Sequence, residues 1–162
     1  MSHETGLYMT QKEINREAPA IAFTERMVEA PVDTVWHTLV DFGQWPQWNS
    51  KVSDMKIQGE AREGSAFVWK AGGSRITSTI EEIDAPSRIV WSGKTLGIRA
   101  IHVWEFEEKE GGTLVRSRES FEGPVPSMFR GMAKRMLVST LERGMQELKT
   151  EAEARHRSGR EQ

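Results

Sequence analysis

The spacing of apolar residues along the chain first predicts strands and short helices. Weak alternation over 21–29 indicates a first strand. Over 32–40 the apolar positions follow a helical period, and Pro31 suits the first turn of that helix. Gly43 and Pro46 then leave room for only a short second helix. Six segments typical of β-strands follow, near 51–58, 65–71, 74–83, 88–93, 98–108 and 113–122.

The helical period returns after the Gly-Pro-Val-Pro at 123–126. Apolar residues recur from Phe129 to Leu148, which predicts one amphipathic helix of about 25 residues with Ser127 as its N-cap. The polar residues of this segment define an outer face of the helix, on which few acidic residues lie between the basic ones. We expect this face either to contact a phospholipid surface or a partner, or simply to be solvated. Its residues are Arg130, Lys134, Arg135, Glu142, Arg143, Glu147 and Lys149.

Glycine pairs set the register of the first predicted hairpin. A turn centred on Gly72-Gly73 places Trp69 opposite Ile76 and Phe67 opposite Ser78. These four residues and Ile80 then share the more apolar face of the sheet. Because side chains alternate along a strand, this face should point at the C-terminal helix.

A second hairpin, centred on Gly111-Gly112, puts opposite charges on a wet face by pairing Glu107 with Arg116 and Glu105 with Arg118. A slide of the turn changes the partners but keeps the faces, and one such slide places His102 opposite Glu119. Both registers turn the same residues inward: His102, Trp104, Phe106, Ser117, Glu119 and Phe121.

An inward Glu119 beside His102 allows three interpretations. A buried charge is costly unless it is paired, hydrogen-bonded or wet. First, the two side chains can form a satisfied polar pair that only holds the sheet together. Second, they can orient a hydroxyl or carbonyl group of a bound ligand. Third, they can act as an acid–base couple in an apolar cavity.

The order of these elements predicts an α+β fold in which a curved seven-stranded antiparallel sheet wraps around the long C-terminal helix. Two short helices follow the first strand. Since a long helix cannot fill the whole concave side of a curved sheet, we expect a cavity between them. The segment Trp45-Pro46-Gln47-Trp48 either rims that cavity or is held in the core by its two indoles.

Short motifs recur along the chain in a fixed order. The first are Ala30-Pro31, Val35-Trp36, Asp41-Phe42 and the Trp-Pro-x-Trp-Asn at 45–49. They are followed by Gly64-Ser65-x-Phe67, Ile83-Asp84-Ala85-Pro86, Val90-Trp91-Ser92-Gly93, Gly112-Thr113 and 119–123. Together these motifs resemble the START/Bet v 1-like superfamily, also called SRPBCC, in its polyketide cyclase/dehydrase-like branch. The similarity covers about residues 20–150 in consistent order and spacing. It implies a helix-grip fold and, because the shared motifs are mostly structural, no particular chemistry.

The resemblance favours binding of a small hydrophobic molecule, similar to a lipid, a polyketide or an aromatic compound, between the sheet and the last helix. The alternatives are an enzyme, a polyketide cyclase, aromatase or dehydratase using His102 and Glu119, or an interaction module without a ligand. The residues expected to line the ligand site are Phe67, Trp69, Ile76, Ser78, Trp91, His102, Trp104, Ser117, Glu119, Phe129, Met132 and Met136.

The composition of the chain excludes several classes of partner and cofactor. The chain has 162 residues, 22 basic against 24 acidic, and no cysteine. A net charge of −2 argues against binding driven by bulk charge to nucleic acid or anionic membranes. The absence of cysteine excludes disulfides and thiolate chemistry. Four scattered histidines predict no metal site, and no glycine motif supports a nucleotide, so we expect no cofactor.

Organisation and location follow from the same features. We expect a loose arm over 1–19, one domain over 20–150 and a frayed charged tail over 151–162. The first residues show no apolar block after a basic start, and no apolar run approaches a bilayer span, which favours a cytoplasmic location without stable membrane insertion. No pattern points to a particular protein partner.

Overall fold

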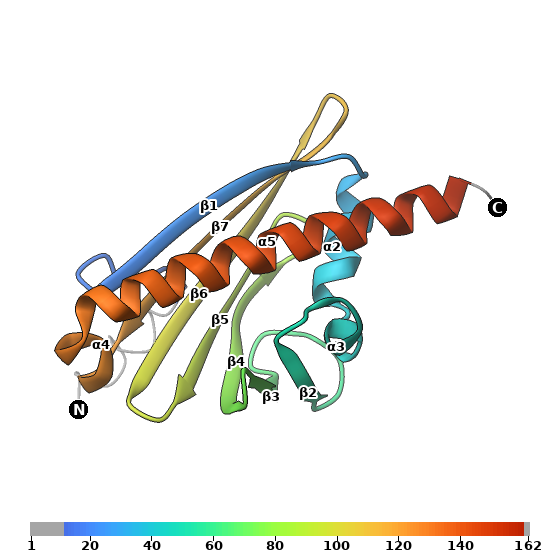
Figure 1. Cartoon of the computed structure of the whole chain (residues 1–162). Helices are drawn as coiled ribbons and strands as arrows, with labels where there is room; N and C mark the ends of the chain where they lie inside the picture. The colour runs from blue at the N-terminus through green and yellow to red at the C-terminus, as the bar shows by residue number, and fades with distance from the viewer. Residues whose placement is uncertain (1–11, 161–162) are drawn as a thin grey trace, which may run out of the picture.

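The computed structural model describes residues 12–160, as one curved sheet crossed by a long helix (Figure 1). In chain order the elements are β1 Ala20–Val28, α2 Val32–Val40, the 3₁₀ helix η1 Phe42–Gln44, α3 Trp45–Trp48, β2 Val52–Ile57, β3 Ala66–Ala71, β4 Ser74–Asp84, β5 Arg88–Thr95, β6 Ile98–Lys109, β7 Gly112–Glu122, α4 Pro124–Met128 and α5 Arg130–Arg160. All neighbouring strands are antiparallel, in the order β1-β7-β6-β5-β4-β3-β2. The predicted fold class is therefore confirmed.

The C-terminal helical region differs from its prediction at both ends. Ser127 lies inside the short helix α4. Phe129, with φ −126° and ψ 54°, is not helical and separates α4 from α5. Ser127 is therefore not the N-cap of the long helix. At the other end α5 continues to Arg160, and Ala152 is fully buried. Residues 151–160, expected to fray, are part of the helix because its last turns still have an apolar surface to cover.

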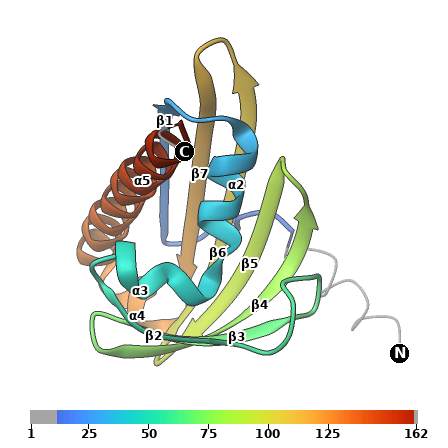
Figure 2. The same ribbon diagram turned by 90° about the vertical axis from the view of Figure 1, so that its right-hand side faces the viewer.

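The core consists of two layers, since α5 packs on β1 and β7 at one side of the sheet. There Ala133, Leu137 and Leu141 meet Ala20 and Ala22. Further along, Met145, Leu148 and Ala152 join a larger cluster with α2 and the sheet. Figure 2 shows the other side, where the sheet curls away beneath α3 towards β2 and β3. The concave face of β4, β5 and β6 is thus left uncovered by α5.

The two hairpins have the predicted faces. Trp69 lies opposite Ile76 and Phe67 opposite Ser78, as expected. In the β6–β7 hairpin the register is the slid one, so His102 lies directly opposite Glu119. In this register Arg116 lies directly opposite Glu105. The expected ion pair still forms on the convex face, where Arg116 reaches diagonally to Glu107 at 2.9 Å.

The convex face is covered by residues that precede β1. Ile14 is buried with Val90, Ile101 and Val103. Asn15 donates a hydrogen bond to Glu122 at 2.6 Å. The described part of the predicted arm, from residue 12, therefore packs on the sheet, while residues 1–11 lie outside the described residues.

Candidate functional site

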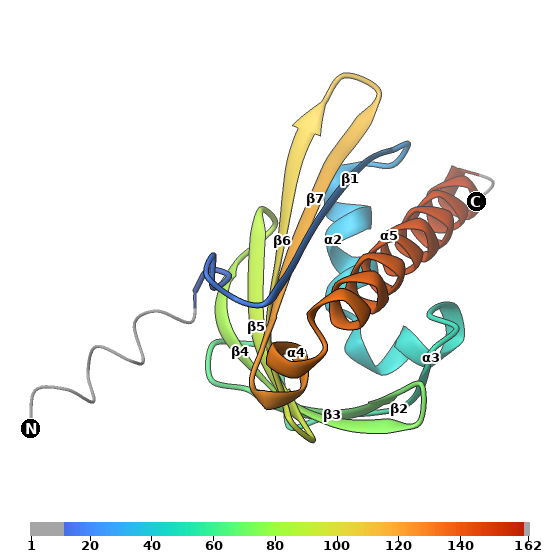
Figure 3. The ribbon, with the colours of Figure 1, turned by 60° about the vertical axis from the view of Figure 1, so that its left-hand side comes forward.

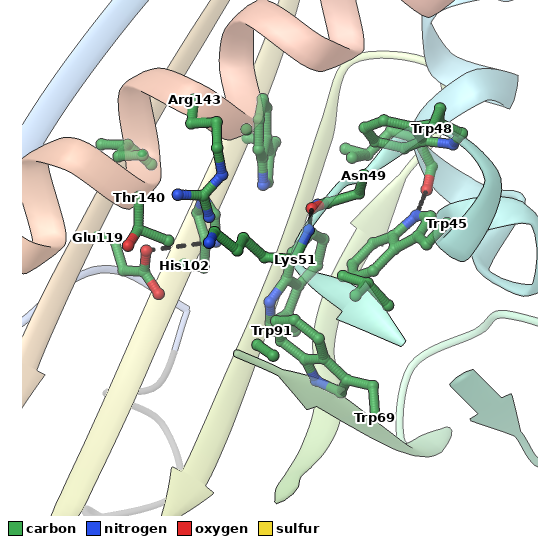
Figure 4. A pocket seen from close by; sticks show the side chains of 16 residues that line it. Trp45, Trp48, Asn49, Lys51, Trp69, Trp91, His102, Glu119, Thr140 and Arg143 are labelled. Carbon is green, nitrogen blue, oxygen red and sulfur yellow. Dashed lines mark hydrogen bonds and ion pairs between the residues drawn. The ribbon is translucent and has the colours of Figure 1, made fainter. Parts of the chain in front are cut away.

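A cavity of about 90 Å³ lies between α5 and the concave face of the sheet, where α3 and the start of β2 approach the helix (Figure 4). It forms because α5 crosses β1 and β7 and leaves the middle strands without a helix above them. Its lining residues are Leu39, Trp45, Trp48, Asn49, Lys51, Val52, Trp69, Ala71, Trp91, His102, Trp104, Glu119, Thr140, Leu141, Arg143 and Gly144.

Indole rings dominate the wall of this cavity. Five of the six tryptophans of the chain line it, and they come from α3, β3, β5 and β6. Trp45 is held in place by donating a hydrogen bond from Nε1 to the Leu39 carbonyl at 2.7 Å, and it packs against Trp91 with ring centroids 5.4 Å apart. Such rigid flat walls favour a flat guest that stacks on them or meets their edges.

His102 and Glu119 meet at the sheet side of the cavity. His102 Nδ1 lies 3.6 Å from Glu119 Oε2, and its Nε2 lies 2.7 Å from Ser117 Oγ. Ser117 in turn donates to the Val103 carbonyl at 3.2 Å, so its hydroxyl is left to accept from His102 Nε2–H. This chain assigns the tautomer of His102 and leaves Nδ1 as an acceptor that faces the carboxyl group of Glu119.

Desolvation keeps this pair uncharged. Burial raises the pKa of Glu119 from 4.5 to about 8 and lowers the pKa of His102 from 6.5 to about 3. The imidazole lies between Trp91 and Trp104, with centroid distances of 5.0 Å to each ring, so little water reaches it. At neutral pH Glu119 therefore carries the proton and His102 is a neutral imidazole.

Three buried donors at the cavity have no hydrogen-bond partner among the described residues: Trp48 Nε1, Trp104 Nε1 and Arg143 Nε. Arg143 Nε does lie 3.4 Å from Glu147 Oε1, but without the direction of a hydrogen bond. By contrast, the indole donors of Trp45 and Trp69 are satisfied: Trp45 Nε1 donates to the Leu39 carbonyl, and Trp69 Nε1 donates to Ser78 Oγ at 3.1 Å. An unpartnered buried donor costs about 1–3 kcal/mol, so three at one cavity form an unusual concentration.

The structure brings some of the predicted ligand residues together and separates others. Five of them line the cavity: Trp69, Trp91, His102, Trp104 and Glu119. Phe67, Ser78 and Ser117 are buried in the wall behind these and reach the cavity only through their contacts. Ile76 lies on the same face of the sheet and outside the lining.

Three residues that the sequence predicted to line the cavity from the C-terminal helical region do not do so. Phe129, Met132 and Met136 are 51%, 63% and 48% exposed. The helix turns the neighbouring positions, Ala133 and Leu137, to the sheet, because each apolar pair along α5 spans about 100° and only one member can face inward. The expected cavity lining by these three side chains is thus corrected.

Other lining residues carried little signal in the sequence. Arg143, expected on the outer face of the helix, points to the cavity, as Figure 4 shows. Thr140 and Gly144 lie within the apolar stripe of 129–148, one and two turns beyond Met136. Asn49 and Lys51 come from the segment between α3 and β2. The sequence placed Asn49 in the Trp-Pro-x-Trp-Asn motif and Lys51 at the start of a strand, and neither signal pointed to a cavity. The segment Trp45-Pro46-Gln47-Trp48 was expected either to rim the cavity or to be held in the core. Each expectation holds for one indole, because Trp45 is buried in the core and Trp48 is half-buried at the rim.

A family profile described as polyketide cyclase / dehydrase and lipid transport matches residues 20–153. The chain belongs to this family. The resemblance expected from the Trp-Pro-x-Trp-Asn segment and the later motifs is thereby confirmed. A search of curated proteins by sequence finds no match.

Solved structures agree with the family in fold. A hypothetical protein from Helicobacter pylori has a TM-score of 0.75 at 16% identity, over 88% of this chain and 93% of that one. The Zhui aromatase/cyclase from Streptomyces sp. R1128 has a TM-score of 0.74 at 16% identity, over 83% and 94%. A START superfamily protein from Mycobacterium smegmatis has 0.69 at 17%, over 83% and 97%. At these identities the similarity shows the helix-grip fold alone.

Within residues 12–160, no helix is both long and apolar enough to span a membrane. Over the same range, no group of three or more histidine, aspartate or glutamate side chains is placed to hold a metal ion.

Proposed function

We propose that the chain binds a small, flat aromatic or conjugated molecule that carries hydrogen-bond-accepting oxygens. The observation that carries this proposal is the cavity walled by indoles in which buried donors lack acceptors. Aromatic rings supply apolar contact, and a few fixed polar groups set the orientation of the guest, which is the usual division of labour in a ligand pocket.

The polar groups at the cavity are mostly donors. Trp48, Trp104 and Arg143 each present an N–H without a partner among the described residues, and a protonated Glu119 adds a hydroxyl. Lys51 adds a second cation beside Arg143. A carbonyl, phenolate or carboxylate oxygen would satisfy these groups, whereas a pure hydrocarbon would leave them unpaired.

The volume limits the size of the guest. A cavity of about 90 Å³ is smaller than the roughly 300–1,000 Å³ of pockets for drug-sized ligands, so it fits a single ring. A guest of about 9 non-hydrogen atoms, at about 0.6 kcal/mol each, binds with about 5.5 kcal/mol. That corresponds to a dissociation constant of about 0.1 mM.

Calorimetric titration with benzoate and with toluene tests the proposal. Benzoate should bind near 0.1 mM and toluene at least tenfold more weakly, because only benzoate satisfies the donors. Trp104→Phe keeps an aromatic side chain at this position and removes the N–H, so it should reduce the preference for benzoate over toluene. Trp36→Phe is the matched control, since Trp36 is buried outside the cavity. Equal binding of the two probes, or an equal loss in both variants, would overturn the proposal.

A dehydratase or cyclase is the second candidate, and the protonated Glu119 favours it. The acid could give its proton to the leaving hydroxyl of a β-hydroxy ketone as the C–O bond breaks. The carboxylate formed would then take the proton from the carbon next to the ketone, so that water is the only species lost. With a pKa of about 3, His102 is too weak a base for this and would position Glu119 instead.

An aryl β-hydroxy ketone such as 4-hydroxy-4-phenylbutan-2-one reports this reaction, because its enone product absorbs in the near ultraviolet. We expect turnover that is lost in Glu119→Gln and that declines above pH 8, as the acid ionises. Absence of turnover, or turnover unchanged in that variant, would exclude the enzyme and leave the binding proposal to its own titration.

A further inference from the structure

One end of the molecule combines exposed apolar side chains with basic ones. At this end the turn between β5 and β6 lies beside α4 and the start of α5 (Figure 3). The amide of Val125 donates a hydrogen bond to the Gly97 carbonyl at 3.2 Å, which joins the turn to α4. We call the turn 94–99 and the segment 124–138 together the basic apolar end.

The apolar residues of this end are far more exposed than a core requires. Leu96 is 96% exposed, Met128 75% and Met132 63%. Val125, Phe129, Met136 and Val138 are between 39% and 51% exposed. So many exposed large apolar side chains at one end of the molecule are typical of an interaction site.

The charges at this end have a single sign. Residues 123–141 and 93–99 contain no aspartate or glutamate, although the whole chain has a net charge of −2. The nearest acid along the strands is Glu122, which lies opposite Arg99. The exposed bases are Lys94, Arg99, Arg130, Lys134 and Arg135.

These bases also lack ion pairs within residues 12–160, in contrast to arginines elsewhere. Arg118 contacts Glu13 and Glu105 on the convex face, and Arg26 contacts Glu142. Along the rest of α5, Arg143, Lys149 and Arg155 each have an acid four residues away. The first turns of α5 therefore hold three exposed bases, Arg130, Lys134 and Arg135, whose positive charge is left for an external partner.

We infer that the basic apolar end docks on an anionic lipid surface. Exposed methionine, leucine and phenylalanine side chains beside lysine and arginine are the composition of elements that lie at a membrane interface. The protruding positions of Leu96 and Met128 suit a deformable bilayer that admits apolar side chains at any point. A folded protein would need matching hollows and a mixed-charge rim. Such docking goes beyond ligand binding and places the protein where apolar ligands dissolve.

Sedimentation of the full chain with lipid vesicles tests this inference. Vesicles of phosphatidylcholine with about 30% phosphatidylserine should carry the protein down at 0.1 M salt, and vesicles of phosphatidylcholine alone should not. Each basic residue near an anionic surface contributes about 1 kcal/mol, which is about fivefold in affinity. Arg130→Gln, Lys134→Gln and Arg135→Gln together should weaken binding by about 100-fold.

A matched control removes the same charge elsewhere. Lys56→Gln, Arg62→Gln and Arg157→Gln together neutralise three exposed bases away from this end and should leave vesicle binding within about twofold. Met132→Gln with Met136→Gln should weaken binding to anionic vesicles at both 0.1 M and 0.5 M salt, because it removes the apolar contribution and not the charge.

Three results would overturn the inference. The first is a protein that stays in solution with anionic vesicles at 0.1 M salt. The second is an equal loss in the control triple variant, which would mean that bulk charge is responsible. The third is a dimer in solution that the Met132→Gln and Met136→Gln pair dissociates, since a second copy would then cover this face. None of these results depends on a ligand in the cavity.

Discussion

Replacing Glu119 by glutamine should change the way stability depends on pH. The folded protein holds the pKa of Glu119 at about 8, against 4.5 for the free side chain, because burial disfavours the charged form. Glutamine has the same shape and can still donate to His102 Nδ1. The variant therefore removes the titration and keeps the contact.

The magnitude follows from proton linkage. Below pH 4.5 the carboxyl group is protonated in both states, and Glu119 imposes no cost. Between pH 4.5 and about 8 only the unfolded chain releases the proton, so the free energy of unfolding falls by about 1.4 kcal/mol per pH unit. From pH 5 to pH 8 this amounts to about 4 kcal/mol, which is a large part of the stability of a domain of this size.

Comparison with the variant isolates this contribution. His102, with its pKa lowered to about 3, opposes folding as the pH falls below 6.5, and that effect is common to both proteins. We therefore expect Glu119→Gln and the wild type to differ little at pH 5. At pH 8 the variant should be more stable by about 4 kcal/mol in urea unfolding. Glu60→Gln, at an exposed position, should show no such trend.

Two outcomes would refute the reasoning. A difference between Glu119→Gln and the wild type that stays constant from pH 5 to pH 8 would mean that Glu119 is not desolvated. A difference of the opposite sign, with the wild type gaining stability as the pH rises, would mean that Glu119 is ionised and paired with a protonated His102.

The remaining predictions concern the helix and its junction with the sheet, and all three can be read from urea unfolding. Leu137→Ala should cost about 2–5 kcal/mol because Leu137 is fully buried, whereas Val138→Ala, at an exposed neighbour, should stay within about 0.5 kcal/mol. Gly97→Ala should destabilise by at least about 1 kcal/mol, since φ is +75° and its Cβ would lie 2.5 Å from Val125 Cγ2. Ala152→Asp should cost about 3 kcal/mol or more by placing a charge in the core, and wild-type stability in this variant would show that the helix beyond residue 150 is dispensable.

The sheet could be predicted nearly complete from the sequence because its signals are local. Glycine pairs mark the turns, and a side-chain period of two fixes the face once a turn is placed. The inward position of His102 and Glu119 follows from that rule alone. Their direct opposition depends on the register of the turn, for which the sequence allowed two solutions and the packing of the sheet selected one.

The helix was predicted less well because its orientation is not a local property. Apolar residues occupy two neighbouring positions in each turn of α5, such as Met132 with Ala133 and Met136 with Leu137. The sequence permits either member to face the sheet. Small alanines on β1 let the helix approach closely there, and this selects Ala133 and Leu137 and exposes the methionines.

The cavity itself is a product of the tertiary structure. The sequence by itself determined the strands, most of the helices, the order of these elements, the faces of the strands and the family. Where α5 crosses the sheet depends on contacts between residues about a hundred positions apart, and that crossing decides which tryptophans face empty space. It also brings Arg143 and Lys51 to the cavity and leaves Phe129 at the surface. These placements depend on long-range packing, which leaves no periodicity or residue spacing in a single sequence from which it could be predicted.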